Sequence, residues 1–353
     1  MKRYGNLYPL VCKSDNLLQA HKNARRGKTH YPAVMKVDAR QDVYLKKLQD
    51  MLVRHEFVNS RYDVFYKTGR RKNRWIYKLP YFPDRIVHHA IVQVMDFVWD
   101  RNLIRDTYSS IKNKGIHDGV KRMKGFLKDR DGTKYCLKMD IRKFYPSVDH
   151  DILKVILRRK IKCRDMLSLL DRIIDSGTGV PIGNYLSQYF GNLYLSCYDH
   201  WMKEVRRVKY YSRYCDDIVI LGSDKSRLHD LHCATVEYIG DRLNLSLKDG
   251  TRVFPVDSGT LDYMGYVFKH DHVRVRKSIV QEFKRKVRNI KKNYTRMPAS
   301  QVINTVMSYY GWFLYANTRN LWQKYMDNEM VSIMSKVCFN NDLKSSKIIR
   351  SIT

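Results

Sequence analysis

Apolar and polar residues follow two patterns along this chain, one typical of helices and one typical of strands. Much of the chain carries apolar residues three and four positions apart, which predicts helices with one buried face. Helices are expected over 40–57, 84–101, 150–161, 164–177 and 229–247, and over much of the chain from 278 onward. Two more are expected, one after Gly115 and one after the Gly/Pro-containing loop that begins at residue 179. The most apolar stretch, residues 86–99, is interrupted by His88, His89 and Asp96, so we expect a buried helix and not a membrane span.

Short apolar runs bounded by turn residues predict the strands. Two strands are expected in 61–82 around a basic turn at 68–71, and one in 134–141, which runs to Asp140. Hairpins are expected in 208–222 and in 261–277. Because these strands are short and separated by helices, the pattern predicts a compact α+β centre flanked by two helical or mixed lobes.

The charge balance points to a polyanionic partner. The chain has 67 Lys and Arg against 35 Asp and Glu, a formal net charge of +32. A charge of this size on a globular chain favours a nucleic acid partner over a merely soluble basic surface. The seven cysteines contain no C-x-x-C pair, which argues against a zinc ribbon or disulfide scaffold and fits a reducing cytoplasm. We see no signal peptide, so a cytoplasmic location is expected.

Two adjacent aspartates, Asp216 and Asp217, lie against an apolar run in this basic chain. Successive strand residues face opposite sides, so both can approach one face only at the tip of a hairpin. Asp140, at the end of its predicted strand, offers a third carboxylate. Three carboxylates at strand ends suit two Mg²⁺ ions that hold the attacking and leaving oxygens of a phosphoryl transfer. The alternative is structural, with Asp216 in a turn and Asp140 as a helix cap.

The residues around these aspartates resemble the reverse transcriptase family. Tyr-Cys-Asp-Asp at 214–217 matches its Tyr-x-Asp-Asp motif, and LKMDIRKFYPSVDH around Asp140 matches its first palm motif. VPIGNYLSQ, a lysine after LNLSL, LDYMGYVF and two finger motifs also occur in the family's order. The resemblance covers about residues 55–320. It implies an α+β right-hand polymerase with fingers, a ferredoxin-like palm and a helical thumb, and thus an RNA-directed DNA polymerase.

The resemblance also implies boundaries and site residues. It places the fingers with an N-terminal extension at 1–133, the palm at 134–275 with a helical insertion near 150–180, and the thumb at 276–353. The implied catalytic residues are Asp140, Asp216 and Asp217, and Ile141 joins them in the metal site. Two Mg²⁺ ions are expected there, with Mn²⁺ as a possible substitute. The implied nucleotide-binding residues are Lys72, Arg74, Phe144, Tyr145, Ile182, Gly183, Gln188 and Lys248.

Tyr145 and Ile182 carry the most specific of these implications. A flat ring at Tyr145 against C2′ of the incoming sugar leaves no room for a 2′-hydroxyl, which favours deoxynucleotides. Most reverse transcriptases have a glutamine where this chain has Ile182, and Ser-Pro where it has Ser187-Gln188. Both departures match the enzymes of diversity-generating retroelements. Losing one amide hydrogen bond is worth roughly 1 kcal/mol, enough to lower fidelity but not to explain selectivity for adenine.

That subgroup implies error-prone copying of a template-repeat RNA, using dNTPs and a cDNA primer, into adenine-mutagenised cDNA that replaces a variable repeat. It also implies a small basic accessory variability protein as a partner. One alternative is a retron, group II intron-like or abortive-infection reverse transcriptase. Another is a non-enzymatic RNA-binding protein on a decayed polymerase scaffold, against which the retained aspartates and Tyr145 argue.

The predicted helix after residue 278 has a basic surface. Phe283, Val287, Ile290 and Tyr294 form one apolar stripe on it. Lysines and arginines occupy the other faces, which suits contact with the phosphates of a template–primer duplex. The nucleic-acid-binding residues expected there are Lys284, Arg285, Arg288, Lys291 and Lys292.

Overall fold

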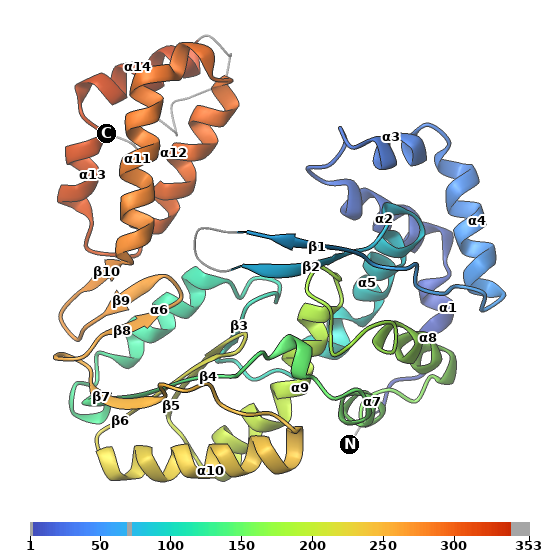
Figure 1. Cartoon of the computed structure of the whole chain (residues 1–353), viewed down its shortest axis with the longest axis horizontal. Coiled ribbons are helices and arrows are strands. Elements are labelled where there is room, and N and C mark those ends of the chain that lie inside the picture. The colour runs from blue at the N-terminus through green and yellow to red at the C-terminus, as the bar shows by residue number, and fades with distance from the viewer. Residues whose placement is uncertain (1–2, 69–72, 340–353) are drawn as a thin grey trace. The chain divides into compact units, whose positions relative to one another are not determined.

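The computed structural model describes residues 3–68 and 73–339 (Figure 1). The chain forms two compact units. The first comprises residues 1–112, 139–218 and 230–251, and the second comprises 113–138, 219–229 and 252–353. The division expected from the sequence, with boundaries at 133 and 275, stays a prediction.

The first unit begins with helices. They are α1 (Tyr8–Val11), α2 (Ser14–Arg25), α3 (Pro32–Asp38) and α4 (Gln41–Val53). The structure confirms the helix predicted over 40–57 as α4, whereas α1, α2 and α3 were not predicted. The following hairpin pairs β1 (Asp63–Lys67) with β2 (Arg74–Lys78) in antiparallel register. The two predicted strands of 61–82 are therefore confirmed, and most of their turn lies outside the described residues.

Helix α5 (Ile86–Asp100) is the buried helix that the apolar run predicts. Ten of its residues are buried, including His88. A short turn with a kink, Tyr81–Arg85, precedes it, and Phe82 within this turn has an extended, non-helical backbone. Helix α2 packs against α5, where the Asn16 side chain donates to the carbonyl of Ala90.

A five-stranded sheet has the order β3-β5-β6-β4-β7. Its strands are β3 (Thr107–Tyr108), β4 (Tyr135–Asp140), β5 (Tyr210–Tyr214), β6 (Asp217–Gly222) and β7 (Arg252–Pro255). Strand β3 pairs with β5 in parallel, and β4 pairs with β7 in antiparallel orientation. Strands β4 to β7, with the helices between them, follow the β-α-β-β-α-β order of a ferredoxin-like unit. The predicted α+β centre is thus a ferredoxin-like palm.

The connecting helices are α7 (His150–Arg158), α8 (Arg164–Ile174), α9 (Ser187–His200) and α10 (Lys225–Leu243). Helix α7 begins after Asp149, whose carboxylate accepts hydrogen bonds from the main-chain N–H groups of Asp151 and Ile152. A π-helical turn, Trp201–Val205, extends α9. Aromatic side chains join α9 to α10, since Trp201 stacks on Tyr238 at 4.5 Å.

The second unit contains α6 (Ile116–Phe126), a three-stranded sheet and four helices. The sheet has the order β10-β9-β8, formed by β8 (Leu261–Tyr263), β9 (Tyr266–Phe268) and β10 (Val273–Val275). The predicted hairpin of 261–277 is therefore corrected to three strands, because the chain reverses again at Gly265, which has a φ of 86°. The helices are α11 (Lys277–Asn293), α12 (Ala299–Phe313), α13 (Arg319–Tyr325) and α14 (Asn328–Phe339).

The buried face of α11 matches the predicted stripe. Phe283, Val287 and Ile290 are at most 2% exposed, whereas Tyr294 lies in the short 3₁₀ turn after the helix. Phe283 stacks on Trp322 of α13. The three-residue 3₁₀ turns elsewhere are Asp131–Thr133 and Tyr145–Ser147. The seven cysteines all lie in the described residues, and none is joined to another by a disulfide bond there. Among the described helices, none has both the length and the apolar character needed to cross a membrane.

Candidate active site

The paired aspartates lie at a tight turn in the sheet. Strand β5 ends at Tyr214, Cys215 and Asp216 form the turn, and Asp217 begins β6. Cys215 has a φ of 58°, a left-handed conformation that few residues other than glycine adopt readily. This residue interrupts the regular alternation of side chains immediately before Asp216 and Asp217. The structure thus confirms the predicted position of the pair at the tip of a hairpin.

Tyr145 connects this turn to the segment that follows Asp140. Asp140 is the last residue of β4, not a helix cap, and Tyr145 begins a 3₁₀ turn a few residues later. The Tyr145 hydroxyl lies 3.1 Å from the Cys215 sulfur. Burial, together with Asp216, raises the pKa of Cys215 to about 11, so the thiol stays protonated near neutral pH. Burial, Cys215 and Asp216 raise the pKa of the Tyr145 hydroxyl as well. The segment after Asp140 and the turn before Asp217 therefore meet through a neutral hydrogen bond.

Lys248 lies beside Asp140 through two contacts. Its main-chain N–H donates to the carbonyl of Asp140 at 2.8 Å, and its Nζ lies 3.5 Å from the Asp140 carboxylate. The antiparallel bridge between Ile141 and Leu247 continues this pairing, and Ile141 is buried. Arg142 binds both carboxylate oxygens of Asp249 at 2.7 Å. The sequence prediction that Lys248 approaches this site is consistent with these contacts.

The residues predicted to bind metal ions offer oxygen donors but do not form a closed cage. Within residues 3–68 and 73–339, no group of three or more His, Cys, Asp or Glu side chains is arranged to hold a metal ion. Asp140 instead forms its ion pair with Lys248, in which both side chains are well exposed. Carboxylates are the ligands that Mg²⁺ prefers, so the type of donor fits a divalent cation.

A glycine-containing loop joins this site to β2. The N–H of Val180 donates to the carbonyl of Tyr145 at 2.9 Å, and the N–H of Tyr77 in β2 donates to the carbonyl of Ile182 at 2.8 Å. Gly183 has a φ of 116°, and a side-chain carbon there would lie 2.5 Å from the main-chain oxygen of Tyr77. Only glycine allows this close approach. The Ile182 side chain is half-buried, so it is not a core residue.

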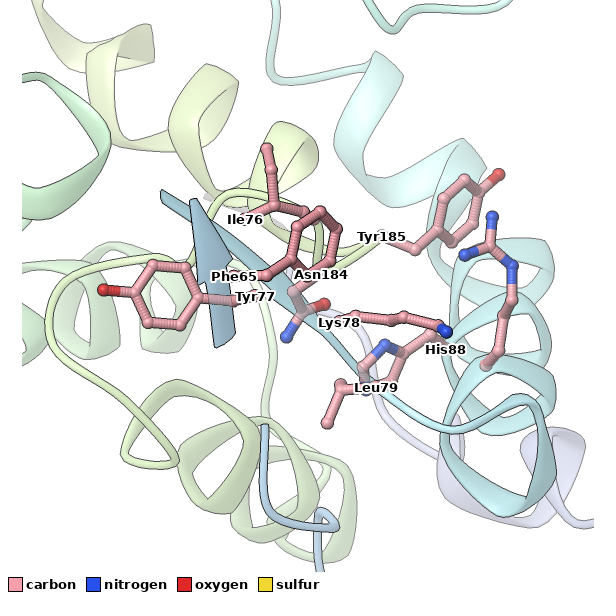
Figure 2. Close-up of a pocket in the computed structure, with 10 residues that line it drawn as sticks. Phe65, Ile76, Tyr77, Lys78, Leu79, His88, Asn184 and Tyr185 are labelled. Atoms are coloured by element: carbon pink, nitrogen blue, oxygen red, sulfur yellow. The ribbon is translucent and has the colours of Figure 1, made fainter. Parts of the chain in front are cut away.

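A cavity of about 200 Å³ lies between the β1–β2 hairpin, α5 and this loop (Figure 2). Figure 2 shows Phe65 and Ile76 at one end and Lys78, Leu79 and His88 at the other. Gly183, Asn184, Tyr185, Tyr77 and Arg85 complete its lining. The lining contains two cationic side chains and no acid, which favours an anionic or electron-rich ligand. Its volume is below the roughly 300–1,000 Å³ of whole small-molecule sites, so it holds part of a nucleotide at most.

The remaining predicted nucleotide-binding residues are dispersed around this site. Phe144 is buried, and its ring lies beside the Tyr145 ring with a centroid distance of 5.2 Å. Gln188 is exposed, and its Oε1 accepts a hydrogen bond from the Ser110 hydroxyl at 2.6 Å. Arg74 is exposed on β2. Lys72 lies outside the described residues. Their contacts with a nucleotide stay predictions.

The sequence did not predict a buried ion pair that lies behind the turn formed by Cys215 and Asp216. Arg213 of β5 and Asp199 of α9 both have fully buried side chains. The available signal was an arginine inside an otherwise apolar strand, since a buried arginine needs an acidic partner. The sequence does not say which aspartate that partner is.

A comparison with protein families decides the class of this site. The family model for reverse transcriptase (RNA-dependent DNA polymerase) matches residues 66–268, more than half of the chain. The chain belongs to the reverse transcriptase family. The matched region of this reverse transcriptase contains Asp140, Tyr145, Ile182 and the Cys215–Asp217 segment.

Known relatives agree with this family. The reverse transcriptase is 24% identical over 139 residues to protein YkfC of Escherichia coli, a match that covers 36% of each chain. It is 20% identical over 139 residues to the group II intron-encoded protein LtrA of Lactococcus lactis, covering 36% of this chain and 23% of LtrA. These matches thus span well under half the length of either curated relative.

A solved structure supports the fold. Apo telomerase from Candida tropicalis aligns with a TM-score of 0.50 at 10% identity, covering 84% of this chain and 69% of that one. Together with the family and the ferredoxin-like palm, this likeness identifies a right-hand polymerase fold, as the sequence predicts.

Helix α11 of the reverse transcriptase carries the predicted nucleic-acid-binding residues. Arg285, Arg288 and Lys292 are exposed. Lys291 is instead bound by two acids, lying 2.5 Å from Asp327 and 2.9 Å from Glu329. Lys284 lies over the ring of Tyr325 at 5.4 Å. Lys286 on the same helix is exposed as well, and Arg285 lies 3.4 Å from Glu282, so the positive charge that this helix offers to a partner is shared among several side chains.

Proposed function

We propose that this reverse transcriptase copies an RNA template into DNA at the site formed by Asp140, Asp216 and Asp217. The observation that carries the proposal is the 3.1 Å contact between the Tyr145 hydroxyl and the Cys215 sulfur. It joins the segment after Asp140 to the turn that bears the other two aspartates, within the region that matches the family.

Two Mg²⁺ ions, bound by the three carboxylates with Ile141, would neutralise the developing charge of the transferred phosphoryl group. Asp140 must release Lys248 to take part. An ion pair as exposed as this one is worth about 0–1 kcal/mol, so this release costs little. Lys248 is then free to bind the triphosphate as a cation or to donate a proton.

Substrate selection rests on two neighbouring groups. The Tyr145 ring packs beside Phe144, and both rings lie against Gly191, where an added side-chain carbon would be 3.0 Å from Phe144 and 3.3 Å from Tyr145. A ring fixed in this way would exclude a 2′-hydroxyl from the bound sugar. The Ile182–Gly183 loop, hydrogen-bonded to β2, would contact the nascent base pair, and the adjacent cavity would receive part of a nucleotide.

Asp216→Asn tests the polymerase assignment. It replaces a charged metal ligand with a neutral amide of the same shape, so primer extension on an RNA template should fall at least about 10³-fold. Binding of the template–primer should persist, because the basic surface is unchanged. The matched control is Asp230→Asn, an exposed aspartate of α10, which should extend primers normally. Normal extension by Asp216→Asn would refute the assignment.

We further propose that the enzyme serves a diversity-generating retroelement. It would copy a template-repeat RNA with frequent errors at adenines, assisted by a small basic accessory variability protein. The supporting feature is Ile182, whose half-buried side chain has no hydrogen-bonding group where most of the family has an amide. Ile182 would pack against the nucleotide without detecting a displaced base.

Ile182→Gln tests this subgroup. The restored amide should reduce misincorporation opposite template adenines several-fold, as one hydrogen bond of about 1 kcal/mol allows, with less effect on overall rate. The control is Ile182→Leu, which keeps an apolar side chain and should keep the error pattern. The readout is the sequence of cDNA made by folded enzyme on an RNA of mixed composition. Unchanged errors at adenines in Ile182→Gln would remove Ile182 from the mechanism.

A group II intron-like reverse transcriptase is the second candidate. It is favoured by the match to LtrA, which is a group II intron-encoded protein. The same cDNA sequencing separates the two candidates. Errors by the wild-type enzyme that are rare and equal at all four template bases would favour the intron-like enzyme.

A further inference from the structure

A buried ionic network lies directly behind the catalytic turn. The side chains of Arg213 and Asp199 are both 0% exposed, and two parallel hydrogen bonds join them, from Nε at 2.7 Å and from Nη2 at 2.6 Å. The Asp199 carboxylate also accepts from the hydroxyls of Tyr211 at 2.5 Å and Thr107 at 2.9 Å. Four donors therefore fix the carboxylate, and the carboxylate fixes the guanidinium plane.

The same guanidinium also contacts the main chain of the turn. Its remaining nitrogen, Nη1, donates to the carbonyl of Cys215 at 2.8 Å and lies 3.3 Å from Oδ1 of Asn192. Cys215 is the residue with a φ of 58°. A non-glycine residue keeps such a conformation only when its surroundings hold it there. The hydrogen bond from Arg213 is one of the contacts that hold it.

Burying an ion pair carries a large desolvation penalty, which offsets much of the attraction between the two charges. Apolar residues of similar volume often serve stability equally well. The planar guanidinium group of Arg213 does what apolar residues cannot do. It binds Asp199 with two nitrogens and a main-chain oxygen with the third. The network thus connects α9 and β3 to the peptide between Cys215 and Asp216, directly before the two aspartate side chains.

We propose that Arg213 is a positioning residue for catalysis. Held in place by Asp199, it fixes the Cys215 carbonyl and thereby sets where the carboxylates of Asp216 and Asp217 meet the metal ions. The role rests on the proposed polymerase function of the same site, but it also predicts metal affinity, which can be measured without turnover.

Arg213→Lys is the decisive variant. A lysine keeps the positive charge beside Asp199 but cannot bind the carboxylate with two nitrogens and also reach the Cys215 carbonyl. A misplacement of about 1 Å can cost about 10²-fold in rate, so kcat should fall by one to two orders of magnitude. The Mg²⁺ concentration for half-maximal rate should rise several-fold, while KM for template–primer stays within about twofold.

Arg276→Lys is the matched control. Arg276 forms a comparable two-point pair with Asp262, and both residues belong to the other unit of the chain. Its kcat and Mg²⁺ requirement should equal those of the wild-type enzyme. A loss that both variants share would indicate a general effect of replacing a paired arginine and would overturn the proposal.

A second variant covers the case in which Arg213→Lys does not fold. In the double variant Arg213→Met with Asp199→Asn, the asparagine oxygen still accepts from Tyr211, and its amide can donate to the Thr107 oxygen. Methionine fills the remaining volume without a donor for the Cys215 carbonyl. A variant of either design that melts like the wild-type protein and keeps its kcat and Mg²⁺ requirement would overturn the proposal.

Binding of Mn²⁺, followed by electron paramagnetic resonance of the free ion, separates failure of this proposal from failure of the proposed function. A wild-type protein that binds Mn²⁺ but makes no DNA would refute the function alone. Weaker Mn²⁺ binding by Arg213→Lys, by about tenfold, would still support the positioning role. Equal Mn²⁺ binding by the two proteins would refute that role.

Discussion

Gly183 offers a sharp test of how the nucleotide site is built. Gly183→Ala introduces one carbon into the contact between the Ile182–Gly183 loop and β2. The glycine has a φ of 116°, and the new carbon would lie 2.5 Å from the main-chain oxygen of Tyr77, closer than real contacts allow. The neighbouring atom belongs to the main chain, so a side-chain rotation cannot relieve the clash.

The cost follows from two terms. An alanine in this backbone conformation costs about 1–3 kcal/mol. Moving the loop away from β2 breaks the hydrogen bond from the Tyr77 N–H to the Ile182 carbonyl, worth about 1 kcal/mol. We therefore expect Gly183→Ala to lower the free energy of unfolding by about 2–4 kcal/mol. The displaced loop should also raise KM for dNTPs about tenfold, equivalent to about 1.4 kcal/mol of lost binding.

Chemical denaturation and steady-state primer extension measure the two effects. The control is Gly240→Ala in α10, where the added carbon has no atom within 4 Å. That substitution should stabilise the helix by about 0.5–1 kcal/mol and leave KM unchanged. A Gly183→Ala enzyme with wild-type stability and wild-type KM would refute the close approach of the loop to β2.

Two further predictions concern Tyr145 and His88. Tyr145→Val should raise the use of ribonucleotides about 10–200-fold, measured as the ratio of kcat/KM for rNTP and dNTP, whereas Tyr145→Phe keeps the ring and should keep the selectivity. Burial, with His89 and Arg85 nearby, lowers the pKa of His88 from 6.5 to about 3. The folded protein keeps His88 neutral while the unfolded chain protonates it, so stability present above pH 6.5 is lost as the pH falls toward 3. At pH 5 the free energy of unfolding is lower by about 2 kcal/mol because of this proton. His88→Gln should therefore reduce the drop in the free energy of unfolding between pH 7 and pH 5. An equal drop in the wild-type protein and the variant would contradict this.

Elements with a strong apolar period could be predicted from the sequence. The stripe of α11 and the apolar run of α5 are examples, because most of their buried positions carry large apolar side chains. Helix α2 was missed although Leu17, Ala20, His21 and Ala24 face the core at helical spacing. Alanine and histidine give a weak apolar signal. Strands β3 and β7 were missed because two and four residues are too few to show a period.

The candidate site was predictable where it depends on short motifs. Asp140, Asp216 and Asp217 fall at strand ends, as the pattern and the resemblance indicated. The pairing of Arg213 with Asp199 was not predictable, since their contact depends on how α9 packs behind β5. The ion pairs of Lys291 with Asp327 and Glu329 were also not predictable, because these two acidic residues come from a separate segment of the chain.

The order of strands in the palm has a consequence for synthesis of the chain. Strand β4 lies between β6 and β7, and both of these neighbours follow it in the sequence. While the ribosome is still making α7 to α9, β4 has no strand partner, and its apolar residues Cys136, Leu137 and Met139 are not yet covered as they are in the folded protein. Long-range pairing of this kind is slow and leaves an edge open to aggregation. Chains that terminate between residues 141 and 216 should therefore aggregate readily and depend on chaperones for solubility.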